Sequence, residues 1–303
     1  MTRIATFQSA QSALLNLQAA QSREMSAATA VSSGRKATDL AGFGRDAEGV
    51  TALKSMKARL EARQTEASTA AAKLEAQDLH LNEMLSAANE VRTALGEALA
   101  LGRPDGLVGR VEAAFGRVAA ALNAEHAGRP LFAGARTEEQ AFNARTMAEL
   151  AAGGELFGND TIKAVARVDE GVTVETGELA SEIAAPLMER FAAFQARLDG
   201  GGFSSPLTED DRAFLGEALR TLAVGTEPVT AAIVRTGAAA KSVENAQKHL
   251  DDRSVALEGL LGERTEVDMA QALTELQHAQ VAVQATAQVV SQLRGSSLLQ
   301  LLK

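Results

Sequence analysis

The chain has 303 residues and a formal net charge of −9, and it contains 10 Phe but no Trp, Tyr or Cys. The negative charge argues against nucleic acid and anionic membranes as partners. The lack of Cys excludes disulfides, thiolate metal sites and Cys nucleophiles. No apolar stretch approaches the roughly 20 residues that span a bilayer, and residues 1–18 lack the continuous apolar core of a secretory signal. An Ala-rich, aromatic-poor composition is typical of long helical bundles.

The first predicted element is an amphipathic helix over residues 3–31. Its apolar side chains recur at steps of three and four residues, and its polar face consists mostly of Ser, Gln and Asn. Gly34 suits a left-handed cap at the end of this helix. The next segment, 35–49, contains glycines spaced like a phosphate-binding loop, but no strand precedes it and no Gly-Lys-Ser/Thr follows. We therefore expect a hinge between two helices there.

A long helix is predicted from residue 47 to residue 101, followed by a shorter helix from 108 to 126. One apolar row of the long helix repeats at strict intervals of seven: Leu53, Leu60, Ala67, Leu74, Leu81, Ala88 and Leu95. The companion row becomes apolar only towards its end, which predicts that the C-terminal half contacts a bundle more fully. A helix of about 50 residues would extend about 75 Å, the length of a rod.

The middle of the chain changes from helical periodicity to alternation. Apolar and polar residues alternate over 162–168 and 172–175, with 169–171 as a turn, so we predict a β-hairpin within a small mixed segment. Helical periodicity returns over 182–198, and the glycine-rich stretch 200–206 is predicted to be an exposed loop.

Two more helices are predicted before the C-terminal element. Thr208 is expected to cap a short helix, and Pro228 fits the start of a long helix over 229–261. Gly259 and Gly262 are expected to loosen the connection to the terminal helix.

The last helix, predicted over residues 267–293, is apolar over more than one stripe. Two rows at three- and four-residue spacing start at Met269 and at Ala272. Val281 and Val289 lie away from both rows. A surface helix of a monomer would expose part of these side chains. We therefore expect this helix to bind partners, including other chains.

These elements predict a mainly α fold, a long antiparallel helical bundle or coiled coil formed by N- and C-terminal arms with a small β-containing hairpin insert in the middle. The predicted division is 1–45 for the N-terminal helix and hinge, 46–130 for the long arm, 131–180 for the β-containing segment, 181–263 for the returning arm and 264–303 for the C-terminal helix. Such arms would bring the two termini together.

No motif in the sequence indicates an enzyme. The four His residues are far apart and lack the spacing of metal ligands. The acidic clusters 209–211 and 251–252 fit helix caps and solvated faces, and they lack the ligand spacing of a calcium loop. Walker and Gly-x-Ser-x-Gly motifs are missing. We expect no catalytic residues, no cofactor and no metal.

Four stretches carry a family resemblance. Residues 266–302 contain spaced Gln residues and close with Ser297-Leu298-Leu299, residues 31–54 contain a Ser-Ser-Gly segment, and residues 128–134 read Gly-Arg-Pro-Leu-Phe-Ala-Gly. These stretches, with 234–238, resemble the bacterial flagellin family and within it the hook-associated proteins of the hook–filament junction. The sequence departs from the family at 40–44, where Leu-Ala-Gly-Phe-Gly replaces the usual Asp-Asp pair.

The resemblance implies a structural function. In this family the two terminal helices pair, line the inside of a tube and drive polymerisation, and a ring of junction subunits joins the hook to the filament. The implied partners are further copies of the chain, a neighbouring hook-associated protein, flagellin subunits and an export chaperone on the C-terminal helix. Export through the flagellar type III apparatus without a cleaved signal peptide implies an extracellular location in the flagellum.

Apolar residues of the two terminal helices form the predicted subunit interface. They are Ile4, Phe7, Leu14, Leu17, Met25, Met269, Leu273, Leu276, Val283, Val290, Leu293, Leu298 and Leu302. Three other interpretations stay open: a flagellin of the filament itself, a helical coiled-coil protein unrelated to flagella, and a bundle closed within a monomer.

Overall fold

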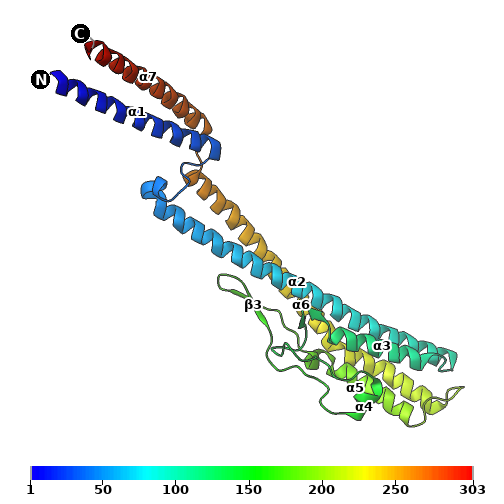
Figure 1. The fold of residues 1–303 in the computed structure, drawn as a ribbon. Coiled ribbons are helices and arrows are strands. Elements are labelled where there is room, and N and C mark those ends of the chain that lie inside the picture. Colours follow the sequence, from blue (N-terminus) through cyan, green and yellow to red (C-terminus); the bar gives the residue numbers. More distant parts are fainter. Residues whose placement is uncertain (1, 302–303) are drawn as a thin grey trace. The chain divides into compact units, whose positions relative to one another are not determined.

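A computed structural model describes residues 2–301, together with the side chains of residue 8 and of residues 11–292. The fold is mainly helical with small two-stranded hairpins in the middle, as predicted (Figure 1). The elements in chain order are α1 (Thr2–Ser33), η1 (Ala41–Asp46), α2 (Ala47–Leu101), α3 (Leu107–Leu122), β1 (Glu125–His126), β2 (Arg129–Pro130), α4 (Met147–Ala152), β3 (Val165–Asp169), β4 (Val172–Glu175), α5 (Ala180–Asp199), α6 (Glu209–Thr265) and α7 (Met269–Leu301).

The chain divides into two units. Unit 1 consists of Met1–Arg59 and Arg253–Lys303, and unit 2 is Leu60–Asp252. Unit 1 therefore contains α1, α7 and the adjoining ends of α2 and α6, whereas unit 2 contains everything between.

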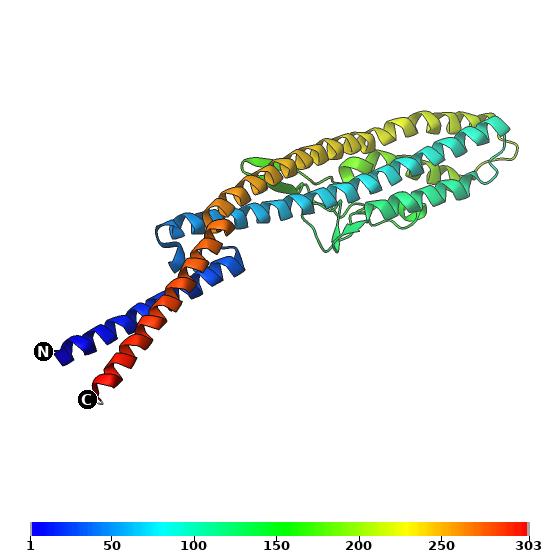
Figure 2. The ribbon, with the colours of Figure 1, turned by 90° about the horizontal axis from the view of Figure 1, so that it is seen from above.

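In unit 1, α1 and α7 lie side by side and run antiparallel (Figures 1 and 2). The connections from α1 to α2 and from α6 to α7 also pair with each other. The Lys36 N–H donates to the Thr265 carbonyl at 2.8 Å, and the Val267 N–H donates to the Gly34 carbonyl at 3.0 Å. Gly34 has a φ of +68°, which confirms the predicted left-handed cap. The two connections thus form one joint rather than two separate loops.

The core of unit 2 is made by α2, α3, α5 and α6. The predicted seven-residue row of α2 faces inward, and its members from Ala67 to Leu95 are buried. Phe115 of α3 packs edge-on against Phe191 of α5, with ring centroids 5.5 Å apart. The gradient of burial along α2 confirms that its C-terminal half makes the fuller contact.

The predicted hairpin is formed by β3 and β4, which pair antiparallel with Ala166 opposite Val174. A register shift lies between Arg167 and Asp169. Val168 and Val174 are buried against α2 and α6 in a small apolar cluster. Alternation along the two strands therefore holds the hairpin on the helices by one face.

Two helix boundaries were predicted wrongly. The helix expected to reach residue 126 ends at Leu122, because Glu125–His126 and Arg129–Pro130 form a tight hairpin. The break expected at Pro228 does not occur, since α6 runs without interruption from Glu209 to Thr265 and also passes through Gly259 and Gly262. At Gly225 the backbone of α6 approaches that of α5 closely: a Cβ there would lie 3.3 Å from the Pro186 carbonyl oxygen. α6 therefore packs closely against α5 just before Pro228.

Candidate functional site

The terminal helix pair is the candidate site, and its contact face is built from small side chains. Ala13 and Ala20 of α1 and Ala272 of α7 are buried. Small residues let two helix backbones approach closely. The half-buried residues that continue this face of α7 are Leu276, Ala279, Val283, Thr286 and Val290. The row that begins at Ala272 therefore faces α1.

The other apolar row of α7 shares Leu276, Val283 and Val290 with the first row, and its first two residues remain uncovered. Met269 is 51% exposed and Leu273 is 49% exposed. On α1, Leu14 is 42% exposed and Met25 is 69% exposed, whereas Leu17 is half-buried. One helical neighbour covers one stripe of a helix, so the pairing within the chain leaves these side chains in solvent.

The predicted interface residues thus separate into two groups. Leu17, Leu276, Val283 and Val290 belong to the seam between α1 and α7, and Leu14, Met25, Met269 and Leu273 lie outside it. The side chains of Ile4, Phe7, Leu293 and Leu298, and all of Leu302, lie outside the part of the chain that the structure describes.

Three further apolar side chains are exposed on the pair. They are Leu15 at 60%, Val281 at 63% and Val289 at 50%. The sequence signal for the two valines is their position away from both apolar rows of α7. Leu15 gave no such signal, because its neighbour Leu14 fits the periodic row. The pair therefore exposes apolar side chains in more than one direction.

Charged residues are scarce on the terminal helices. Residues 11–33 contain only Arg23 and Glu24, and residues 269–292 contain only Glu275 besides His278. Several hydroxyl groups are used locally: Ser26 Oγ donates to the Ser22 carbonyl at 2.9 Å, and Thr286 Oγ1 donates to the Ala282 carbonyl at 2.7 Å. These faces can be buried without desolvating many charges.

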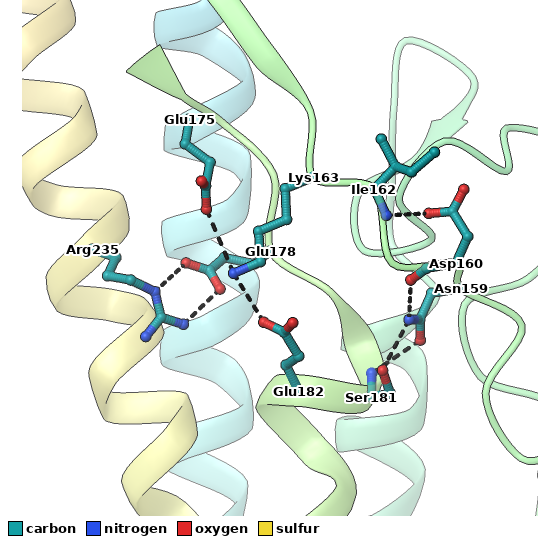
Figure 3. A network of polar contacts seen from close by, with 9 residues as sticks. All are labelled: Asn159, Asp160, Ile162, Lys163, Glu175, Glu178, Ser181, Glu182 and Arg235. Carbon is teal, nitrogen blue, oxygen red and sulfur yellow. Dashed lines mark hydrogen bonds and ion pairs between the residues drawn. The ribbon is translucent and has the colours of Figure 1, made fainter.

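A second polar arrangement, in unit 2, attaches the β-containing segment to the helices (Figure 3). The carboxylate of Glu178, which is 5% exposed, accepts from Arg235 Nε at 2.8 Å and from Arg235 Nη2 at 2.7 Å. Lys163 Nζ lies 2.9 Å from Glu182 and 3.5 Å from Glu175. The hydrogen bond with Glu182 raises the pKa of Lys163 above its usual value. These ion pairs connect the segment to α5 and α6.

Asp160 and Asn159 fix the neighbouring loop (Figure 3). Asp160 accepts from the Ile162 N–H at 2.9 Å and from the Ala135 N–H at 3.1 Å. These bonds stabilise the carboxylate and lower the pKa of Asp160. Asn159 exchanges hydrogen bonds with Ser181 at the start of α5. The loop is thereby anchored at both ends.

The middle of the stretch 128–134 is part of the core, whereas Gly128 and Arg129 are exposed. Phe132 and Ala133 are fully buried, and the Phe132 carbonyl accepts from the Ala180 N–H at 2.9 Å. The buried amide of Gln77 donates to the carbonyls of Leu131 and Thr176. Sequence reasoning did not identify Gln77, because its partners lie 54 and 99 residues away.

In the described part of the chain, no group of three or more His, Asp or Glu side chains is arranged to hold a metal ion. No helix among the described residues is both long enough and apolar enough to cross a membrane.

Comparisons with known proteins indicate one family. Residues 219–302 match the family described as the bacterial flagellin C-terminal helical region. No curated protein matches the sequence. A protein described as a flagellar hook-associated protein from Vibrio parahaemolyticus has a similar solved structure, with a TM-score of 0.62 and 15% identity over 73% of this chain and 97% of that one. FlgL from Bacillus cereus gives a TM-score of 0.57 and 14% identity over 70% of this chain and 99% of that one.

The two solved structures share their fold with this chain, and the family match covers α6 from residue 219 to its end and all of α7. Helical termini, a small hairpin insert and a flagellin C-terminal region therefore occur in one chain. Residues 219–302 of the chain match the bacterial flagellin C-terminal helical region, and the fold resembles that of the hook-associated protein FlgL.

Proposed function

We propose that the chain is the junction subunit that joins the flagellar hook to the filament, and that it polymerises through α1 and α7. Its partners in this proposal are further copies in a ring, a neighbouring hook-associated protein and flagellin subunits. In this proposal the apolar side chains of the two terminal helices form the contact between subunits. The fold shared with hook-associated proteins supports this choice.

The observation that carries the proposal is the incomplete burial of the terminal pair. Leu14, Met25, Met269 and Leu273 remain between 42% and 69% exposed even though α1 and α7 already cover each other. Large apolar side chains that stay exposed on a paired helix are candidates for an interaction site. A bundle closed within a monomer would have buried these side chains.

In this proposal the chain is divided by role. Residues 1–45 and 264–303 form the inner polymerisation domain, residues 46–130 and 181–263 form the arms, and residues 131–180 form a small insert. The protein is exported unfolded through the flagellar type III apparatus, and it functions in the extracellular flagellum. An export chaperone covers the C-terminal helix before export. The complete lack of Cys is compatible with that route.

A filament flagellin is the second candidate, because the matching family region is that of flagellin itself. Labelling of intact flagella with an antibody against this chain separates the two candidates. A single band at the hook–filament boundary is expected for a junction subunit. Staining along the whole filament would identify a flagellin instead.

Deletion of residues 264–303 tests the role of the terminal helices. The truncated chain is expected to remain a soluble monomer that cannot join hook to filament, because α1 loses its partner. Motility of a deletion strain complemented with either chain provides the measurement, with the full-length chain as the control. Normal assembly and motility with the truncated chain would rule out polymerisation through the terminal helices.

A further inference from the structure

The six methionines whose side chains the structure describes fall into two groups by exposure. Met25, Met56 and Met269 are 69%, 57% and 51% exposed. Met84, Met147 and Met188 are at most 3% exposed. The sequence has no Cys, Trp or Tyr, so the exposed thioethers are the side chains most readily oxidised by peroxides.

Two of the three exposed methionines lie on the terminal pair. Met269 is the first residue of α7, and Met25 lies on α1. Met25 lines a groove of about 320 Å³ between α1 and the segment after it, together with Ser22, Ser26 and Arg35. The third, Met56, lies on α2 and outside the pair.

Neither Met25 nor Met269 belongs to the buried seam between α1 and α7. That seam is formed by residues such as Ala20 and Ala272, which are 7% and 2% exposed. A chemical change at Met25 or Met269 therefore leaves the pairing within the chain intact and alters the face that is free to meet a neighbouring copy.

We propose that Met25 and Met269 are oxidation-sensitive sites, at which conversion to methionine sulfoxide by a hydroperoxide prevents a copy from assembling. The inference rests on the proposed function, because it requires that the terminal helices bind neighbouring copies. A copy that has already assembled covers both thioethers and is resistant to the same oxidant.

The chemical step is a two-electron oxygen transfer. The thioether sulfur attacks one oxygen of hydrogen peroxide, the S–O bond forms as the O–O bond breaks, and the peroxide is reduced to water. The product is a polar sulfoxide whose oxygen accepts hydrogen bonds. Burying that group against an apolar neighbour without a donor weakens binding by roughly tenfold or more.

Limited treatment of the purified full-length chain with hydrogen peroxide tests the assignment of the sites. Peptide mass spectrometry is expected to find Met25, Met56 and Met269 oxidised well before Met84, Met147 and Met188, because access governs the rate. Assembly onto hooks isolated from a strain that lacks this chain is expected to fall in step with oxidation of Met25 and Met269. Methionine sulfoxide reductases are expected to restore it.

Leucine variants assign the effect to particular residues. The double variant Met25→Leu/Met269→Leu keeps the apolar volume but has no thioether at either position. Peroxide treatment is expected to leave its assembly at whatever level is measured before treatment. The matched control Met56→Leu, at a methionine of similar exposure, is expected to stay as sensitive as the wild type. Circular dichroism checks that each variant keeps its helical content.

Oxidation rates of the wild-type chain in the free and assembled states provide a test without substitutions. Met25 and Met269 are expected to oxidise several-fold more slowly in assembled flagella than in the free chain. The inference is overturned by equal oxidation rates in both states, or by undiminished assembly of chains with both methionines converted. The proposed function survives the second result. Failure of the untreated chain to assemble on isolated hooks refutes the proposed function and this inference with it.

Discussion

Two glycines in the stretch 128–134 show why a short motif can be required by the core. Gly128 and Gly134 have φ values of +73° and +71°, a region that costs residues with a Cβ about 1–2 kcal/mol. Their surroundings differ. A Cβ on Gly128 would meet nothing within 4 Å, whereas one on Gly134 would lie 2.1 Å from an Asp160 carboxylate oxygen. Gly134 thus lets the chain pass directly against the carboxylate that anchors the loop.

We expect Gly134→Ala to destabilise the protein more than Gly128→Ala does. Gly128→Ala should lower the free energy of unfolding by about 1 kcal/mol through its backbone conformation alone. Gly134→Ala should add an overpacking cost of about 1–3 kcal/mol. Urea unfolding followed by circular dichroism measures both variants. Equal losses would mean that Asp160 moves aside without cost.

The carboxylate of Asp211 is buried beside an arginine and a threonine at the start of α6. Asp211 is fully buried, and its carboxylate accepts from Arg197 Nη2 at 2.6 Å and from Thr208 Oγ1 at 2.7 Å. The Arg197 hydrogen bond, followed by that of Thr208, holds the pKa of Asp211 far below its usual range. Thr208 in turn accepts from the Asp211 N–H, so it caps α6 as predicted.

Because the folded pKa of Asp211 is lower than the unfolded value of about 3.9, ionised Asp211 stabilises the protein above that pH. The contribution is lost as the pH falls towards the folded pKa. The stability difference between the wild type and Asp211→Asn should therefore be large at neutral pH and shrink below about pH 4. Urea titrations over this range measure it.

Glu244 provides the control for Asp211. Lys241 and Lys248 lower the pKa of Glu244 to about 2, but all three side chains are largely exposed. Exposed ion pairs on a helix contribute little to stability. Glu244→Gln should change the free energy of unfolding far less than Asp211→Asn at neutral pH, and a comparable change would show that burial of Asp211 is unimportant.

At the scale of elements, apolar periodicity predicted where most helices lie. It did not predict which face of a helix packs against which other helix. The seven-residue row of α2 predicted both the helix and its buried face. In α7 two apolar rows compete, and periodicity alone does not determine which of them faces α1. The row containing Ala272 does, since its small side chains allow closer contact than Met269 and Leu273 would.

Other features depend on contacts between distant residues. Glu178 and Arg235 are 57 residues apart, and Asn159 and Ser181 are 22 apart. No local pattern marks such pairs, so the anchoring of the β-containing segment was not predicted. The close approach of Gly225 to α5 is likewise a contact between distant parts of the chain, and no local pattern marks it.

The exposed positions of α7 and the positions that face α1 should respond differently to substitution. Leu273 is 49% exposed, so Leu273→Gln should change the stability of the monomer by no more than about 0.5 kcal/mol while it weakens assembly. Leu276 faces α1, so Leu276→Gln should destabilise the pair itself. Hydrogen exchange of α1 and α7 in dilute protein measures the pairing, and attachment to isolated hooks measures assembly. Loss of pairing in Leu273→Gln would reverse the assignment of the two rows.

At the scale of the whole molecule, charge is distributed unevenly between the units. Unit 1 contains 12 Lys and Arg against 9 Asp and Glu, for a net charge of +3. Unit 2 contains 18 against 30, for a net charge of −12. Copies that associate through the terminal helices would join nearly neutral surfaces, while their unit 2 portions repel one another.

We therefore expect salt to favour assembly. Raising the NaCl concentration from about 0.01 M to about 0.1 M shortens the screening length from about 30 Å to about 10 Å, which weakens repulsion between the acidic units and leaves apolar contacts in place. Sedimentation of the full-length chain with isolated hooks across this range measures the effect. Replacing the exposed acids Glu112 and Glu138 by Gln should lower the salt concentration needed. Assembly that decreases with salt would instead mean that opposite charges, rather than apolar faces, hold neighbouring copies together.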